Sequence, residues 1–205
     1  MRIPRTGQPD WLMVIMTTMV GAWILWACAA CSTPRESEFV LRRLATGMVD
    51  ATDLPLGWGD RRSTVPEVSN ATARSITYYA IGPGTPYVNV GQRILIYPSE
   101  DASKAAFQDT VAQTIPAAYE DEWVTPPELT FAANADEIRV ACLSGFVNGI
   151  PHRTCSMIAR YGDMLTHLHG NVFEDRWLTM EQFRRLVQQV DAKMYRASQL
   201  SPDKP

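Results

Sequence analysis

Two cysteines, Cys142 and Cys155, lie on either side of the dipeptide Asn148-Gly149, and this arrangement constrains the fold more than any other feature of the sequence. Asn-Gly between two extended runs is the strongest short-range signal for a two-residue hairpin turn, because both central positions of a type I′ turn need a positive φ. If Val147 faces Ile150 across this turn, the pairing that continues outward along the two strands brings Cys142 directly opposite Cys155.

The same register places both cysteines at a non-hydrogen-bonded pair. Pro151 falls at such a pair too, so its missing N–H breaks no bond within this hairpin. The Cα atoms of a non-hydrogen-bonded pair lie about 4.5 Å apart, which a disulfide accepts. We therefore predict a disulfide between Cys142 and Cys155; the alternative is two unpaired thiols in the core.

A second hairpin is predicted at Gly162-Asp163, and its register agrees with the first. Residues of the three strands that share the face of the cysteines are mostly apolar, as a buried face requires. We expect this face to consist of Ile138, Val140, Cys142, Phe146, Cys155, Met157, Ala159, Met164 and Leu168.

The N-terminus carries an export or membrane signal. Arg2 and Arg5 precede a stretch from Trp11 to Ala30 that holds no charged residue. A secretory signal has an apolar region of about 7 to 15 residues, whereas a membrane-spanning helix needs about 20. The two basic residues predict that the chain beyond about residue 31 lies across the membrane from the cytoplasm, whichever of the two this segment is.

The end of this segment resembles the lipobox of bacterial lipoproteins, in which a cysteine is lipidated and becomes the new N-terminus. Leu25-Trp26-Ala27 precedes Cys28, and Ala29-Ala30 precedes the second candidate, Cys31. The alternative is an uncleaved transmembrane anchor in which both cysteines are ordinary buried residues. Both alternatives predict a membrane-tethered protein, lipid-anchored or single-span, with its domain on the extracytoplasmic side.

Composition and charge exclude two other classes of protein. The chain of 205 residues is 46% hydrophobic and 20% charged, which is typical of a globular protein rather than a disordered one. Its formal net charge is −3, and no run of basic residues offers a footprint for nucleic acid. We expect no nucleic-acid partner.

The remaining elements are predicted from the spacing of apolar residues and from the caps, prolines and glycines that begin and end helices and strands. One helix is predicted over 35–49, and a second runs from the cap Ser99 to Pro116. The last helix is predicted to begin at Thr179, which forms a capping box with Gln182. Strands are predicted over 74–81, 87–97 and, within a Pro-rich connection, 129–132, while 64–73 is predicted to be a loop.

This order predicts an α+β fold with a mainly antiparallel sheet covered by helices. We expect residues 1–31 to form the signal peptide or anchor, 32–52 a linker with a short helix, 53–197 the extracytoplasmic domain, and 198–205 a polar tail.

Several short motifs of this domain resemble those of small exported bacterial lipoproteins of unknown function, some of which have a PsbP-like α/β/α sandwich. The resemblance rests on Asp53-Leu54-Pro55-Leu56-Gly57-Trp58, on the strand that ends in Ile94-Leu95-Ile96-Tyr97-Pro98-Ser99 before an Ala-rich helix, on the cysteine pair and on the closing helix. It implies a noncatalytic accessory or ligand-binding role outside the membrane, and it supplies no active site.

Two sets of residues are candidates for a site. The aromatic residues Trp58, Tyr78, Tyr87 and Trp123 could line an apolar or carbohydrate-binding cleft, against the alternative of ordinary core and edge residues. His167 and His169 are two apart on a strand and share a face, which is a candidate metal site.

Geometry argues against a three-histidine metal site. The register puts His152 on the same face, but His169 falls opposite Ser156, which is about 13 Å along the strand from His152. A two-histidine site would need a carboxylate nearby, and none lies on this stretch. We therefore expect no cofactor.

The function predicted from these observations is a membrane-tethered extracytoplasmic lipoprotein that acts as a binding or protein-interaction module. No G-x-S-x-G, HExxH or P-loop spacing occurs. The alternatives are a cell-envelope hydrolase that uses His152, His167 or His169, and a passive structural protein of the envelope.

Overall fold

The computed structural model describes residues 34–66, 68, 70–80, 88–116, 122–147 and 149–201. The predicted signal or anchor segment, with Cys28 and Cys31, lies outside the described residues. One compact unit spans Phe39–Pro205, and it holds the sheet and the packing around it.

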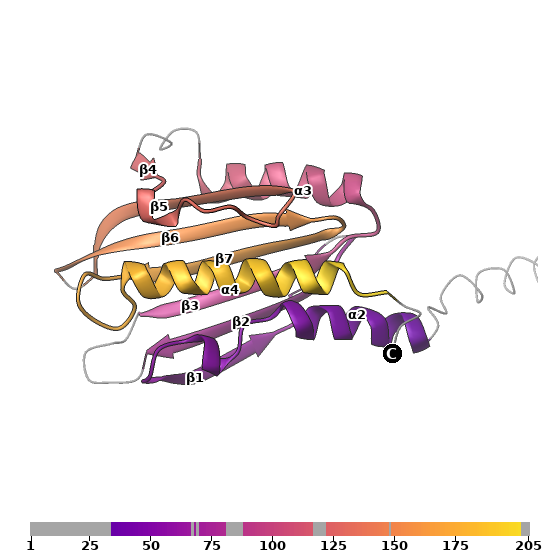
Figure 1. The fold of residues 1–205 in the computed structure, drawn as a ribbon, viewed down its shortest axis with the longest axis horizontal. Helices are drawn as coiled ribbons and strands as arrows, with labels where there is room; N and C mark the ends of the chain where they lie inside the picture. The colour runs from indigo at the N-terminus through magenta and orange to yellow at the C-terminus, as the bar shows by residue number, and fades with distance from the viewer. Residues whose placement is uncertain are drawn as a thin grey trace, which may run out of the picture. The chain divides into compact units, whose positions relative to one another are not determined.

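Seven strands form one sheet in the order β1-β2-β3-β7-β6-β5-β4, in which every neighbouring pair is antiparallel (Figure 1). The strands are β1 (Trp58–Thr64), β2 (Thr72–Ala80), β3 (Asn89–Ile96), β4 (Trp123–Val124), β5 (Glu137–Val147), β6 (Ile150–Tyr161) and β7 (Met164–Val172). The α-helices are α2 (Pro34–Gly47), α3 (Glu100–Thr114) and α4 (Met180–Ser198), and short 3-10 helices occupy Ala51–Asp53 and Pro127–Leu129. The fold class is α+β, as predicted.

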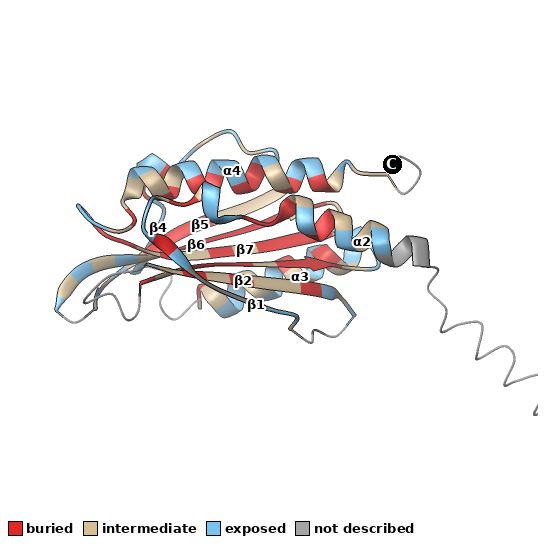
Figure 2. Ribbon diagram, turned by 90° about the horizontal axis from the view of Figure 1, so that it is seen from below, coloured by how far each residue is buried: buried red, intermediate tan, exposed pale blue. Residues whose placement is uncertain are grey.

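Helices cover both faces of this sheet, so the domain has three layers. Figure 2 shows α2 and α4 on one side and α3 on the other. The larger core joins α2 and α4 to the sheet through side chains such as Leu44, Phe183 and Leu168. The smaller core joins α3 to the opposite face, where Phe107 packs with Leu95, Ile158, Leu165 and Ala73. We call these two sides of the sheet the α4 face and the α3 face.

The hairpin registers predicted from the sequence are confirmed. Val147 pairs with Ile150, and Cys142 pairs with Cys155 at a Cα–Cα distance of 4.0 Å. The structure contains the predicted disulfide between these two cysteines, and neither of them is accessible to solvent. The second turn pairs Tyr161 with Met164, and its residue Gly162 has a φ of +59°, a conformation that glycine adopts without strain.

The closing helix begins where its capping signals predict. The Thr179 side chain accepts a hydrogen bond from the Gln182 N–H, and the Gln182 side chain accepts one from the Thr179 N–H. Leu178 and Phe183, on either side of this cap, are fully buried and occupy the two positions of a hydrophobic staple. The stripe of Leu186, Val187, Val190 and Met194 then packs α4 against the sheet.

Three details of the sequence-based prediction are wrong. Residues Trp58–Thr64 form the edge strand β1, although their polar sequence shows no apolar alternation. The strand expected over 129–132 is absent from that position, where the described chain has a 3-10 helix ending at Leu129, and β4 lies upstream. Phe146, expected on the core face, is 75% exposed because the β5–β6 hairpin extends beyond the cover that α4 provides.

Within the described part of the chain, no helix is long and apolar enough to cross a membrane.

The disulfide should contribute measurably to stability. Replacing both cysteines, Cys142→Ala with Cys155→Ala, should lower the free energy of unfolding by about 2 to 4 kcal/mol, because the unfolded chain loses a cross-link. Urea unfolding followed by tryptophan fluorescence measures the difference. Dithiothreitol should destabilise the wild-type protein by a similar amount and leave the double variant unchanged; a variant as stable as the wild type would contradict this role.

Candidate functional site

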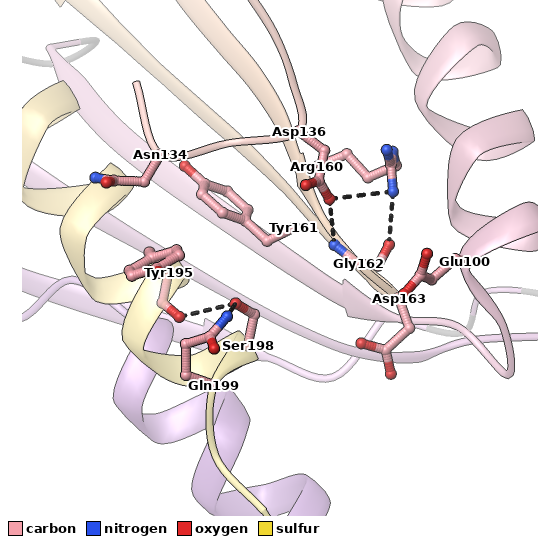
Figure 3. A pocket seen from close by; sticks show the side chains of 10 residues that line it. All are labelled: Glu100, Asn134, Asp136, Arg160, Tyr161, Gly162, Asp163, Tyr195, Ser198 and Gln199. Atoms are coloured by element: carbon pink, nitrogen blue, oxygen red, sulfur yellow. Dashed lines mark hydrogen bonds and ion pairs between the residues drawn. The ribbon is translucent and has the colours of Figure 1, made fainter. Parts of the chain in front are cut away.

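We compare three hollows of the domain, each named here by its place. The turn cleft lies at the β6–β7 turn and measures about 380 Å³ (Figure 3). The hairpin hollow lies at the end of the β5–β6 hairpin and measures about 600 Å³. The histidine hollow, of about 260 Å³, contains the predicted pair His167 and His169.

Two residues that line the turn cleft, Asn134 and Tyr161, donate to a buried carboxylate behind it. Asp191 of α4 is 3% exposed and accepts hydrogen bonds from the Asn134 backbone N–H, the Asn134 amide and the Tyr161 hydroxyl, the last at 2.8 Å. Burial, together with the negative charge of Asp191, raises the pKa of Tyr161 far above its ordinary value. Tyr161 therefore stays protonated and acts as a permanent donor to this carboxylate.

Three charged residues that line the turn cleft, Asp136, Arg160 and Asp163, are also paired. Arg160 contacts Glu137 at 2.7 Å. It also contacts Asp136 at 3.3 Å, and Asp136 accepts a hydrogen bond from the Gly162 N–H (Figure 3). Asp163 forms an ion pair with Arg43 of α2. Because these groups satisfy one another, they join α2, the β6–β7 turn and the start of β5, and they have little polar capacity left for a ligand.

The hairpin hollow has a mixed apolar and polar lining. Phe146, Val172, Phe173 and Met180 form its apolar part, and Glu128, Ser144, Arg153 and Glu174 are among its polar residues. Phe173 is buried and its ring packs edge-on against Trp177, with the ring centroids 4.7 Å apart. The exposed ring of Phe146 lies at the same hollow. An apolar wall with a polar rim and a volume of several hundred Å³ is typical of ligand sites.

His152 contributes a polar group to the hairpin hollow. Its ring stacks on Phe173 with the centroids 5.7 Å apart, and its Nε2 lies 3.2 Å from the Thr154 hydroxyl. The other ring nitrogen, Nδ1, is buried and has no hydrogen-bond partner among the described residues. The imidazole of His152 is therefore a lining group of the hollow, with one ring nitrogen near a hydroxyl and the other buried.

His167 and His169 share the α3 face of β7, as predicted. Their ring centroids lie 5.7 Å apart, and the register pairs His169 with Ser156, also as predicted. Burial, the neighbouring His169 and the charge of Arg93 lower the pKa of His167 to about 4. Burial and Arg93 also lower the pKa of His169. Both rings are therefore neutral at pH 7.

The two histidines do not gather further metal ligands. Among the residues that the structure describes, no group of three or more His, Cys, Asp or Glu side chains could hold a metal ion. The histidine hollow is instead lined by hydroxyl groups and by Arg93. Because a cation would meet the positive charge of Arg93 there, this arrangement favours an anion over a metal.

The described aromatic residues that were predicted to line a cleft do not form one: two belong to the larger core and the third lies apart. Trp58 and Tyr78 are buried, with the Trp58 N–H donating to the Trp177 carbonyl and the Tyr78 hydroxyl donating to the Val49 carbonyl. Trp123 lies on β4, at the opposite edge of the sheet from Trp58. Tyr87 lies outside the described residues.

No protein-family model matches this chain, and no curated protein is significantly similar to it. The candidate sites therefore rest on the geometry of the chain itself.

The sequence did not predict two residues that define the candidate sites, Phe146 at the hairpin hollow and Arg93 in the histidine hollow. Phe146 was expected in the core, and Arg93 was not singled out because it lies on β3, far from the histidines in sequence. The pairing of β3 with β7 brings Arg93 directly opposite His167. The alternation of polar and apolar residues along β3 could have placed Arg93 on a face, but not beside the histidines.

The lowered pKa of His167 predicts a pH dependence of stability. Between its ordinary pKa of 6.5 and about 4, the unfolded chain binds a proton at His167 that the folded chain does not. Folding stability should therefore fall as the pH falls through this window, with a slope of at most about 1.4 kcal/mol per pH unit from this ring. Urea unfolding at several pH values should show a shallower slope for His167→Gln than for the wild type. Equal slopes would contradict a neutral, buried His167.

Proposed function

We propose that this protein is an exported binding module, tethered to the cell membrane by its N-terminal segment. The observation that carries the proposal is the Cys142–Cys155 disulfide in a domain that comes after an uncharged N-terminal stretch. Disulfides of this kind persist in oxidising compartments outside the cytoplasm and are rare inside it. Lipidation at Cys28 or Cys31 is the form of tether that the lipobox-like sequence supports.

The binding part of the proposal rests on the hairpin hollow. Its volume of about 600 Å³ is in the range of small-molecule sites, and Phe146 offers an exposed ring at its edge. The hollow is also lined by His152, Ser144 and Arg153, which add polar groups at its wall. We propose that this hollow receives a ligand or partner segment with an apolar part.

A noncatalytic accessory role in the cell envelope completes the proposal. This role is the one implied by the resemblance to small exported lipoproteins with a PsbP-like sandwich domain. It requires that binding, rather than turnover of a substrate, be the activity that is lost when the hairpin hollow is altered.

Metabolic labelling with an alkyne analogue of palmitate tests the tether. One of the two variants Cys28→Ala and Cys31→Ala should lose the label and leave the membrane fraction or stay unprocessed, while the other should behave as the wild type. The Cys142→Ala, Cys155→Ala double variant is the control and should keep the label. If the wild-type protein is unlabelled but stays in the membrane, the tether is an uncleaved transmembrane span and not a lipid. A wild-type protein found in the soluble cytoplasmic fraction would overturn the proposal.

Site-specific photocrosslinking in intact cells tests the hairpin hollow. A photoreactive amino acid at Phe146 should give a discrete adduct with a ligand or protein partner, because this ring is exposed beside the hollow. The same amino acid at Gln188, an exposed position of α4 outside the hollow, is the matched control and should give none. The photoreactive amino acid is also placed at Ser144 and Arg153, which line the hollow. If none of the three positions gives an adduct, as at the control position, the binding role of this hollow is refuted.

A further inference from the structure

The histidine hollow differs from the other hollows in its chemistry. It is formed where β2, β3 and β7 meet the segment after β1, and it shares no lining residue with the hairpin hollow. The groups able to contact a ligand there include the hydroxyls of Thr64 and Ser75, the guanidinium of Arg93 and the rings of His167 and His169.

Arg93 is the first reason to assign a function to this hollow. Its side chain is partly buried, yet among the described residues no carboxylate forms an ion pair with it. By contrast, Arg43 and Arg160 are paired with Asp163 and with Glu137. A guanidinium held partly away from water is costly unless an anion is close to it.

The second reason is that the described lining contains no acidic residue. The lining groups are hydroxyls, imidazoles and the guanidinium, together with Pro66 and Gln92. The Gln92 amide is already used on the α4 face, where its oxygen accepts from the Val49 N–H and its nitrogen donates to Gly47 and Thr166. The hollow therefore presents one positive charge and several hydrogen-bond donors without a competing negative charge.

The position of the imidazoles is fixed by the chain around them. A Cβ atom on Gly91 would lie 2.3 Å from Cε1 of His169, so the ring packs directly against the bare backbone of β3. His167 lies opposite Arg93 in the register, and its Nε2 is 3.5 Å from the Ser156 hydroxyl. Each neutral imidazole carries one N–H that can donate to a bound oxygen.

From these observations we propose that the histidine hollow is a binding site for a small oxyanion, either a phosphate or a carboxylate group. Arg93 pairs with the anion through its planar array of donors, and His169, Ser75 and Thr64 complete the hydrogen bonds. The site does not depend on the hairpin hollow or on the membrane tether, so its failure would leave the proposed function intact.

Titration of the full-length protein in detergent micelles with inorganic phosphate, and separately with acetate, tests the site at constant ionic strength. With the histidine rings labelled by ¹³C, the Cε1–H signals of His167 and His169 should shift and saturate, while that of His152, outside the hollow, should not. Saturation by phosphate alone assigns a phosphate group, saturation by acetate alone assigns a carboxylate, and saturation by both assigns a general oxyanion site. Shifts that stay linear for both anions, or that appear equally at His152, would overturn the proposal.

Matched variants identify the residue responsible. Arg93→Gln should weaken binding at least about tenfold, which is the value of one charge-assisted hydrogen bond. Arg74→Gln is the control, because Arg74 lies on the adjacent strand β2 and points to the opposite face by strand alternation. Gly91→Ala keeps the charge of Arg93 but displaces the His169 ring, so it should also weaken binding and serves if Arg93→Gln fails to fold. Unchanged affinity in both folded variants would refute the site.

One further variant tests whether the chain supplies the anion itself. Glu67 is close in sequence to Thr64 and Pro66 and lies outside the described residues. If the wild-type protein binds neither anion and Glu67→Gln binds one, the partner of Arg93 is an internal carboxylate and the proposal is wrong. Equal binding by the wild type and Glu67→Gln supports an external ligand.

Discussion

The buried carboxylate of Asp191 is the interaction on which the arrangement of this domain depends. A charge at this depth is tolerated only when donors surround it, and here they come from Asn134, ahead of β5, and from Tyr161, at the end of β6. One donor belongs to the loop before β5 and the other to the sheet, so the contact fixes the rotation of the helix about its own axis. The apolar stripe that includes Phe183 and Met194 is thereby held against the larger core, and a helix turned by one position would bury the carboxylate without partners.

The unequal cover of the two faces explains where the hollows lie. The α4 face is filled by two helices, and the hairpin hollow lies where the β5–β6 hairpin extends past them. The α3 face is covered by one helix, whose small core is centred on Phe107 and leaves the histidine pair outside it. A polar residue such as Arg93 can therefore remain on the sheet surface beside a hollow, since no helix packs over it. Both candidate sites are consequences of how far the helices reach.

Much of this fold could be predicted from the sequence, and the reason differs between elements. The two hairpins and the start of α4 depend on short-range signals, Asn148-Gly149, Gly162-Asp163 and the Thr179 capping box, which act within a few residues. Strand β1 depends on its pairing with β2 and carries no apolar pattern of its own. The histidine hollow was predicted least well, because the pairing of β3 with β7 joins residues about 75 positions apart, and no local signal specifies it.

If the chain is exported, as we propose, the position of the disulfide has a consequence for the order of events after it crosses the membrane. Its cysteines are separated by 13 residues across a tight turn, so they can meet as soon as the β5–β6 hairpin has emerged. The central pairing of β3 with β7, by contrast, must wait until nearly all of the sheet has been delivered. An extracytoplasmic thiol oxidase would therefore act on a small, locally ordered segment while both sulfur atoms are still accessible. Oxidation in this order spares the cell from having to reopen a finished core in which neither cysteine can be reached.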